Sequence, residues 1–443
     1  MRYLFLRGNR NKRFFMNIAD ELSSRGHQCY QIQFELGDLL VSSSHVTSVF
    51  APWHVTKEEY PISDDTLRNM QIYNITFSER MLGKSISKKE LQLYKRYMHF
   101  IDNYIEDHKI ETICMFNGYH WIEQVTTYIA KKRGLNTYFF EDGLFRPYTV
   151  TVDPKGINAN SSVPGTASYY DSLHIDRSRL STYLFEPENR NLTKTNENLI
   201  KVATLKAISM IGGLLKLTPK LYVHTTFWQS IKYILFKLKF KYLEEDNVNL
   251  SNEYIFLPFQ VSRDTQIFYN SPHFKSMEEL LNAVTEAVKE LNSELNRKIR
   301  IIVKEHPEDM SRNNYKELKE KYKDQDSVIF VQKYNTKKLI NKALIVLTIN
   351  STVGIEALAQ SKKVVTVGNA LYNIEGVTFH CKHPEQLKTV IKEAIQNKHN
   401  IERIEKFIYY LRFFYQVEGT INGTNKITAI NIANKLEEGS DSQ

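Results

Sequence analysis

The chain alternates short apolar runs with segments of helical spacing, and this alternation occurs in two series. In the first, an apolar run at residues 3–6 precedes a helix-patterned segment at residues 14–22, and a second apolar run follows at residues 28–34. The order strand, helix, strand predicts a right-handed parallel crossover. The order recurs with expected strands at residues 112–116 and 136–140 around a helix at 121–132. The first part of the chain is therefore predicted to be an α/β unit.

A second series begins near Asn252. Expected strands cover residues 254–258, 298–304, 328–331, 343–348 and 364–367, and helices separate them. The expected helices include residues 277–295, with Leu280, Leu281, Val284 and Leu291 on one apolar face, and residues 336–342. A late aromatic helix is expected at residues 401–415. We therefore predict an α/β protein with two Rossmann-like domains, whose parallel sheets face a central cleft at the carboxyl ends of their strands. The predicted divisions are residues 1–195 for the first Rossmann-like domain, 196–250 for a basic helical connector, 251–400 for the second Rossmann-like domain, and 401–443 for a C-terminal helix and tail.

Several classes of protein are disfavoured by what the sequence lacks. The 443 residues contain only Cys29, Cys114 and Cys381, which are far apart, so neither a disulfide framework nor a zinc ribbon is predicted. The glycine-rich, zinc-protease and nucleophile-elbow motifs of dehydrogenases, P-loop enzymes, zincins and α/β-hydrolases do not occur. The acidic string at residues 324–326 is interpreted as a solvated loop. No metal and no cofactor are predicted.

Residues 201–243 contribute most of the net charge of +9, because they contain eight lysines and no acidic residue. Interleaved aromatic residues favour an anionic membrane surface as partner. Nucleic acid is not predicted, since no RNA-binding or helix-turn-helix signature accompanies the charge. A pair of ordinary helices with solvated lysines remains the alternative. The chain has no uncharged apolar run of about 18 residues and no signal-peptide pattern, so we expect a cytoplasmic protein that contacts a membrane.

Two motifs of the second half follow expected strands. Asn350-Ser-Thr-Val-Gly354 connects a strand to a helix, and helix N-termini attract phosphate, although a plain N-cap is the alternative. Lys304-Glu-His-Pro307 follows another strand, where His306 can donate to a phosphate or sugar oxygen; a loop fixed by Pro307 is the alternative. Both motifs are expected at the same edge of one sheet.

The loop region at residues 141–164 gathers carboxylates and polar side chains. Glu141, Asp142 and Asp153 occur there with Arg146, Asn158, Asn160, Ser161 and Ser162. Two carboxylates in one pocket can divide the work of glycosyl transfer, one at the anomeric centre and one on a proton. The alternative for Asp153 is structural, because Asp-Pro-Lys-Gly has the residue order of a type I turn.

Taken in order, these segments resemble bacterial capsule polysaccharide biosynthesis proteins of the KpsS type. The resemblance extends over roughly residues 1–420 and rests on residues 141–153, 156–164, 257–266, 304–307, 348–354 and 368–372. It implies two Rossmann-like halves, as in GT-B glycosyltransferases. It also implies transfer of β-linked Kdo (3-deoxy-manno-octulosonic acid) from CMP-β-Kdo to lysophosphatidylglycerol or phosphatidylglycerol at the inner leaflet. The product would begin the lipid-linked oligo-Kdo linker of a capsule.

The resemblance further implies a retaining reaction with an aspartate nucleophile, and Asp153 is the matching position, though some relatives have glutamate there. Glu141 is the candidate for proton transfer. The implied nucleotide site consists of Lys304, His306, Pro307, Asn350, Ser351 and Thr352. The implied substrate-binding residues are Arg146, Asn158, Asn160, Ser161, Ser162, Gln260, Arg263, Asp264 and Gln266. Other capsule biosynthesis proteins are expected as partners. A transferase with another nucleotide sugar, and a non-catalytic scaffold for capsule assembly or export, remain the alternatives.

Overall fold

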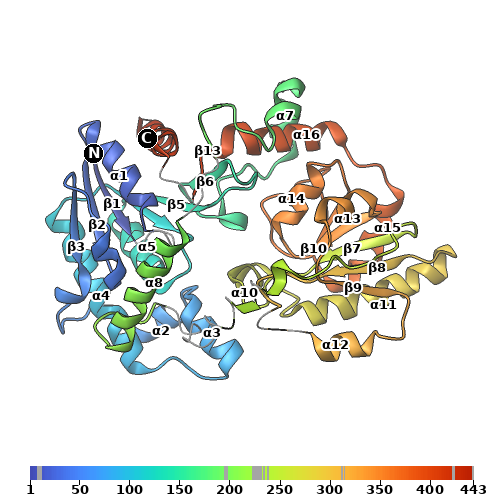
Figure 1. Ribbon diagram of the computed structural model, residues 1–443, viewed down its shortest axis with the longest axis horizontal. Helices are drawn as coiled ribbons and strands as arrows, with labels where there is room; N and C mark the ends of the chain where they lie inside the picture. Colours follow the sequence, from blue (N-terminus) through green and yellow to red (C-terminus); the bar gives the residue numbers. More distant parts are fainter. Residues whose placement is uncertain are drawn as a thin grey trace. The chain divides into compact units, whose positions relative to one another are not determined.

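The computed structural model describes residues 1–6, 12–193, 198–221, 232, 235–236, 239–310, 313, 315–421 and 425–441. The chain divides into two compact units (Figure 1). Unit 1 contains Met1–Ser162, Asp176–His224 and Leu411–Gln443, and unit 2 contains Val163–Ile175 and Thr225–Tyr410. Each unit is therefore assembled from separate stretches of sequence. Much of the expected connector, including residues 222–231, lies outside the described residues.

Unit 1 is built on a seven-stranded sheet with the order β13-β6-β5-β4-β1-β2-β3. The parallel strands are β1 (Arg2–Leu6), β2 (Gln28–Gln33), β3 (Val46–Phe50), β4 (Thr112–Phe116) and β5 (Asn136–Asp142). Their order, 3-2-1-4-5, is that of a Rossmann-like sheet. Two antiparallel strands, β6 (Thr149–Asp153) and β13 (Val417–Glu418), extend it beyond β5.

The helices of unit 1 follow the strands. The longer ones are α1 (Phe14–Ser24), α3 (Tyr73–Leu82), α4 (Lys88–Asp107), α5 (Trp121–Arg133), α8 (Leu199–Leu214) and α17 (Lys426–Asp441). Short turns are α2 (Asp64–Arg68), α7 (Arg177–Tyr183), the 3-10 helices η1 (Leu36–Leu40), η2 (Ala51–Trp53) and η3 (Asn158–Asn160), and a π-helical turn η5 (Leu411–Tyr415).

The apolar periodicity of α1 fixes how this helix packs on the sheet. Phe14, Phe15, Ile18 and Leu22 are at most 2% exposed. The ring of Phe15 meets Phe140 of β5 edge-on, with 5.0 Å between centroids. Burying one such side chain contributes about 1.5–3 kcal/mol, so this face anchors α1 against the sheet.

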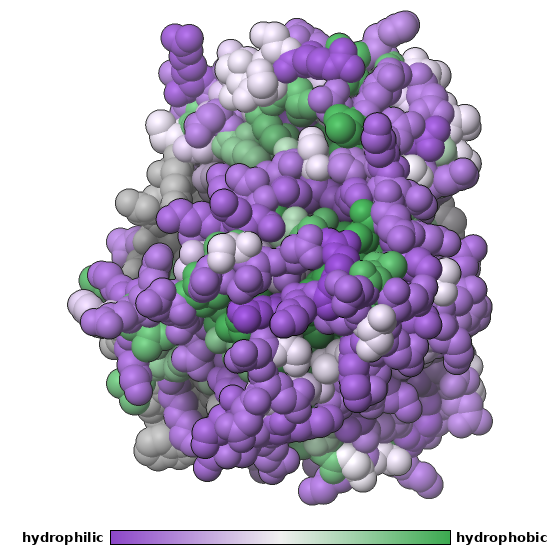
Figure 2. All heavy atoms as spheres, turned by 90° about the vertical axis from the view of Figure 1, so that its right-hand side faces the viewer, coloured by the Kyte–Doolittle hydropathy of each residue, from purple (hydrophilic) through white to green (hydrophobic). Residues whose placement is uncertain are grey.

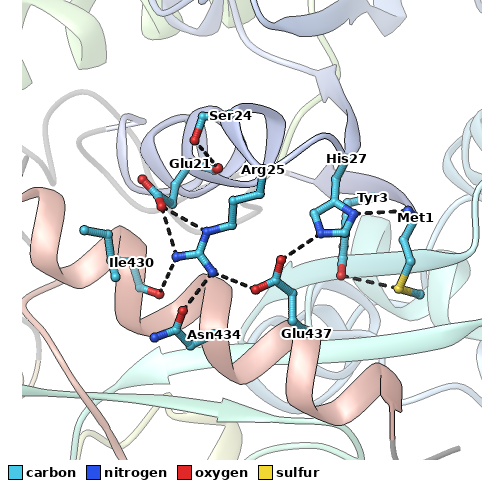
Figure 3. A network of polar contacts seen from close by, with 9 residues as sticks. All are labelled: Met1, Tyr3, Glu21, Ser24, Arg25, His27, Ile430, Asn434 and Glu437. Atoms are coloured by element: carbon cyan, nitrogen blue, oxygen red, sulfur yellow. Dashed lines mark hydrogen bonds and ion pairs between the residues drawn. The ribbon is translucent and has the colours of Figure 1, made fainter.

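The C-terminal helix α17 returns to unit 1 and packs against α1 (Figure 3). The guanidinium of Arg25 donates to the carboxylate of Glu437 at 2.6 Å and to the amide oxygen of Asn434 at 2.7 Å (Figure 3). The second carboxylate oxygen of Glu437 lies 2.8 Å from Nε2 of His27. Burial raises the pKa of Glu437, but His27 and Arg25 outweigh burial and lower it. The end of the chain is thus fixed to its beginning by charged contacts.

Unit 2 is built on a six-stranded, fully parallel sheet with the order β12-β11-β10-β7-β8-β9. The strands are β7 (Tyr254–Pro258), β8 (Arg300–Lys304), β9 (Val328–Val331), β10 (Ile345–Thr348), β11 (Val364–Thr366) and β12 (Phe379–His380). When β7 to β12 are numbered 1 to 6 along the chain, the strands lie in the order 6-5-4-1-2-3, which is again the Rossmann arrangement.

The helices of unit 2 include α11, whose bounds, Met277–Leu295, are those predicted. Its predicted apolar face, with Leu280, Leu281, Val284 and Leu291, is fully buried. The others are α6 (Ala167–Asp171), α10 (Thr265–Asn270), α12 (Lys316–Lys321), α13 (Thr336–Lys342), α14 (Thr352–Leu358), η4 (Pro384–Gln386), α15 (Leu387–Gln396) and α16 (Ile401–Tyr410).

The predicted α/β class, with two Rossmann-like halves of the GT-B kind, is confirmed by these two sheets. The central cleft between them stays a prediction. The face drawn in Figure 2 is mainly hydrophilic, with hydrophobic residues in small groups. Among the described residues, no helix has both the length and the apolar character required to cross a bilayer.

Candidate functional site

Lys304 is the last residue of β8 and lies at the carboxyl edge of the unit 2 sheet. Its ammonium group donates to the hydroxyl of Thr336, at the start of α13. No carboxylate among the described residues forms an ion pair with it. Burial lowers the pKa of Lys304, and Glu356 on α14 and Glu245 only partly oppose this effect. A half-buried cation without a carboxylate partner is suited to receive an anion.

His306 follows Lys304 in the same loop and is half-buried. Its Nδ1 accepts from the backbone amide of Glu308 at 3.2 Å, so Nε2 is the ring nitrogen left for other contacts. Burial lowers the pKa of His306, which keeps the imidazole neutral near pH 7. Glu308 and Asp264 are among the charges that oppose this shift. The loops after β7 and β8 are joined directly, because the Ser262 hydroxyl donates to Asp309 at 2.9 Å. Pro307 is exposed beside them.

Asp264 caps the short helix α10 instead of pointing freely into a pocket. Its carboxylate accepts from the amide of Gln266 at 3.0 Å and from the hydroxyl of Thr265 at 3.1 Å. Burial raises the pKa of Asp264. The neighbouring Arg263 is half-buried.

A buried amide network joins the loops after β7 and β10. Gln260 accepts from the backbone amide of Asn350 at 3.1 Å and donates to the Asn350 side chain at 2.9 Å. Asn350 also donates to Gln266 at 3.2 Å and to the carbonyl of Asn369 at 3.0 Å. Gln260, Gln266 and Asn350 are each at most 9% exposed. The structure therefore brings these three predicted residues together. Their hydrogen bonds fix the loops after β7 and β10 at the carboxyl edge of the unit 2 sheet.

Ser351 is the N-cap of α14, because its hydroxyl accepts from the amide of Val353 at 3.2 Å. Its carbonyl accepts from the Tyr372 hydroxyl at 2.7 Å. A Cβ on Gly354 would lie 2.6 Å from that hydroxyl, so the glycine permits the close approach. The structure shows the N-cap that was the alternative interpretation of this motif. Amides in the first turn of a helix, such as that of Thr352, lack intrahelical partners; the phosphate-binding role stays a prediction.

Asp153, at the end of β6, is fully buried in unit 1. Its Oδ1 accepts from the amides of Lys155 at 2.7 Å and Gly156 at 3.1 Å. Its Oδ2 accepts from the amide and the hydroxyl of Ser162, at 2.7 and 2.9 Å. These donors occupy the lone pairs of both oxygens, so the side chain closes the loop at residues 154–162. The turn-forming interpretation is confirmed, and the catalytic role of Asp153 stays a prediction.

Glu141 lies on the same face of the sheet as Asp153. It is paired with Thr151 across the antiparallel β5–β6 ladder, while Asp153 is paired with Phe139, so the two carboxylates are diagonal neighbours. Glu141 is half-buried and accepts from the Asn117 side chain at 2.6 Å. The two carboxylates predicted to share a pocket are therefore close, with Glu141 the more accessible.

The loop at residues 143–148 is braced from the C-terminal segment of the chain. Buried Gln416 accepts from the amide of Leu144 at 2.9 Å and donates to the Thr151 hydroxyl at 2.9 Å. The Thr149 hydroxyl accepts from the amide of Phe145 at 3.0 Å. Gln416 was not predicted as a site residue, because no local pattern shows that the chain returns here.

The remaining predicted residues of unit 1 border the same loops. Arg146 is 60% exposed and donates to the carbonyl of Gly143 at 3.1 Å. Asn160 donates to the Tyr119 hydroxyl at 3.1 Å, and Asn158 begins the 3-10 turn η3. Ser161 ends that turn and is half-buried. Their role in substrate binding stays a prediction.

Two charge-bearing groups of unit 2 were also missed. Asp309 is fully buried and accepts from the hydroxyls of Ser262, at 2.9 Å, and Tyr315, at 2.6 Å. Glu305 is fully buried and pairs with Lys319 at 2.5 Å. Among the described residues, no cluster of histidine, cysteine and acidic side chains could hold a metal ion.

The two Rossmann-like sheets define the chain as a two-unit α/β protein. Residues 111–407 match the family described as capsule polysaccharide biosynthesis protein, and the chain belongs to this family. It is 24% identical to the capsule polysaccharide export protein KpsS of Escherichia coli, over 85% of this chain and 87% of KpsS. It is 25% identical to protein FixF of Sinorhizobium fredii, over 77% of this chain and 70% of FixF.

Among solved structures, the chain resembles the β-Kdo 2,4-transferase of KpsC from Thermosulfurimonas dismutans. The identity is 17% and the TM-score 0.38, covering 85% of this chain and 96% of that one.

Proposed function

We propose that this protein is a glycosyltransferase that transfers β-Kdo from CMP-β-Kdo to phosphatidylglycerol or lysophosphatidylglycerol. It binds the membrane surface that contains this acceptor, and its product is the start of the lipid-linked linker of a capsule. The observation that carries the proposal is the ammonium group of Lys304 at the carboxyl edge of the unit 2 sheet, which forms no ion pair with a carboxylate in the described part of the chain. The chain also belongs to the capsule family.

The donor site we propose consists of Lys304, His306 and the start of α14 at Ser351 and Thr352. The phosphodiester of CMP-Kdo has one negative charge, which Lys304 can neutralise, while the backbone amide of Thr352 donates to one of its oxygens. The amides of Val353 and Gly354 are already bonded to Ser351. Neutral His306 can donate from Nε2 to a phosphate or sugar oxygen, since Nδ1 is already an acceptor. The amide network around Gln260 and Asn350 holds these loops ready before the ligand arrives.

The catalytic carboxylates we propose lie in unit 1. Asp153 is the proposed nucleophile, and it can act only if one of its donors moves, of which the Ser162 hydroxyl is the one able to rotate away. Glu141, held by Asn117, is the proposed group for proton transfer at the acceptor hydroxyl. In a retaining reaction the nucleophile forms the bond to the anomeric carbon as CMP leaves, and the deprotonated acceptor oxygen then displaces the carboxylate.

The test is incubation of the protein with CMP-Kdo, generated in situ, and a fluorescent phosphatidylglycerol. A mass gain of one Kdo on the lipid supports the proposal, and an unchanged lipid counts against it. Parallel reactions with UDP-sugars test the alternative of a same-fold transferase with another donor. That alternative also predicts that UDP, and not CMP, raises the thermal unfolding midpoint.

A non-catalytic scaffold for capsule assembly or export is the second alternative. It predicts that variants at Asp153 and His306 restore capsule in a strain lacking the gene, whereas deletions within residues 201–243 do not. The proposed transferase predicts loss of capsule in both sets.

A further inference from the structure

Helix α8 of unit 1, the green ribbon labelled α8 in Figure 1, exposes an apolar stripe. The stripe consists of Ile200, Ile211, Leu214 and Leu215, which are 80, 52, 73 and 64% exposed. At 3.6 residues per turn, these positions lie within an arc of roughly 100°. Leu217, just beyond the helix, is a further 54% exposed leucine. So many large apolar side chains on one face of a short helix indicate an interaction surface.

The opposite face of α8 is packed against the 3-10 helix η1. Leu205 and Ser209 are 3 and 8% exposed, and the Ser209 hydroxyl accepts from the amide of Gly37 at 3.2 Å. A Cβ on Gly37 would lie 2.5 Å from the Leu205 carbonyl, so the two elements are in tight contact. This packing holds the stripe facing outward, and η1 adds Leu40, which is 53% exposed.

Lysines flank the stripe. On the helical wheel Lys201 lies roughly 100° to one side of Ile200 and Lys206 roughly 120° to the other. Lys216 and Lys220 follow the helix, and residues 199–220 contain no aspartate or glutamate. An apolar face bordered by cations matches an anionic lipid surface, where leucines enter the acyl boundary and lysine ammonium groups reach the headgroups.

We propose that the stripe of α8 is the docking surface of this protein for anionic lipid bilayers, with the helix lying in the plane of the interface. The 16 residues of α8 extend only about 24 Å, so the helix is too short to span a bilayer. The inference deepens the proposed function, and rests on it in assuming that the acceptor is a membrane lipid. A second copy of the chain or a protein partner on this face are the competing occupants.

The test is cosedimentation of the full chain with vesicles of phosphatidylcholine containing phosphatidylserine, in the absence of donor. Phosphatidylserine supplies negative charge without being the proposed acceptor, so binding is read independently of catalysis. The double variant Leu214→Gln/Leu215→Gln is expected to lower vesicle affinity by at least about tenfold, because each leucine loses most of its transfer free energy. Lys206→Gln is expected to lower it about fivefold, and only on anionic vesicles.

The matched control is Ile401→Gln, which alters a 50% exposed apolar residue on α16 of unit 2. It is expected to leave vesicle binding unchanged. Unfolding midpoints of all variants check the fold, which the outward-facing substitutions should preserve.

The proposal is overturned if the wild-type chain does not cosediment with anionic vesicles, or if the double variant binds them with the same affinity as the wild-type chain. It is also overturned if the wild-type chain is a dimer without lipid and the double variant is a monomer, because the stripe is then a self-interface. Normal vesicle binding without Kdo transfer would instead refute the proposed function and leave the docking surface standing.

Discussion

Replacing Lys304 by methionine tests the main assumption of the proposed donor site, which is that the ammonium group binds the phosphate of the nucleotide. Methionine keeps an unbranched apolar side chain and removes the charge. A hydrogen bond between two charged groups contributes about 1.5–3 kcal/mol. Its loss corresponds to an increase of about 10- to 150-fold in the Kd for CMP. Isothermal titration calorimetry of CMP with wild-type and Lys304→Met protein measures this ratio.

The same variant has a predicted effect of opposite sign on stability. The pKa of Lys304 is lowered by burial in the folded chain, so the unfolded chain binds the proton more tightly. Stability therefore rises as the pH increases from the lowered pKa towards the ordinary value of 10.5, and at neutral pH the charged side chain destabilises the fold. Lys304→Met is thus expected to raise the thermal unfolding midpoint while it weakens CMP binding, a combination that a generally damaged protein cannot show.

Two lysines of unit 2 serve as controls. Lys363 is also half-buried with a pKa lowered by burial, but it precedes β11 at the amino edge of the sheet and donates to the Ile395 carbonyl at 3.0 Å. Lys363→Met should leave CMP binding unchanged. Lys319→Met leaves buried Glu305 without its cation and should cost about 3–5 kcal/mol of stability. Equal CMP affinities in wild-type and Lys304→Met protein, or equal losses at Lys304 and Lys363, would refute the reasoning.

Three further predictions concern both units. Asp153→Ala leaves its buried donors unmatched, so it should lower the free energy of unfolding by about 3–5 kcal/mol and abolish Kdo transfer while unit 2 still binds CMP. Ser162→Ala removes only one donor and should keep the rate of transfer above a tenth of wild type. Faster transfer by Asp153→Ala than by Ser162→Ala would show that Asp153 has a purely structural role. Gln416→Ala should cost about 1–3 kcal/mol in denaturant titrations and slow transfer without changing CMP affinity, because the 143–148 loop loses its brace; a changed CMP affinity would contradict this. Burial lowers the pKa of His306 from its ordinary value of 6.5, so the imidazole becomes a cation only as the pH falls through this lowered pKa. The affinity for cytidine 5′-methylphosphate, a diester of constant charge, should then increase in wild type but not in His306→Gln. An affinity that does not change with pH in wild type would show that His306 does not contact the phosphate.

Much of the fold was predictable because its core elements have strong local patterns. Strands β4, β7 and β9 and helices α11 and α13 have the predicted bounds, since apolar runs and helical periodicity are local properties. Strands β12 and β13 contain two residues each and were missed, because they form only by pairing with distant strands. The helix expected at residues 401–415 is α-helical only to Tyr410 and continues as a π-helical turn.

The candidate site divides in the same way. The N-cap at Ser351 and the turn at Asp153 follow from local sequence and were predicted as alternatives. The lack of an ion pair between Lys304 and any described carboxylate, and the Ser162 bonds that complete the shell of Asp153, depend on where other loops close. The brace by Gln416 depends on a return of the chain from 265 residues away. Local sequence patterns cannot predict such contacts, because they form between residues that are far apart in the sequence and meet only in the packed structure.

Hydrogen–deuterium exchange of the wild-type protein with saturating CMP tests the central claim most directly, because it locates the nucleotide without assuming a reaction. We predict slowed exchange in the peptides that contain residues 304–307 and 350–354, and unchanged exchange at residues 361–363 and 396–400 on the other edge of the sheet. Protection confined to the latter segments, or none at a CMP concentration shown by calorimetry to saturate, would contradict a phosphate site at the carboxyl edge of unit 2.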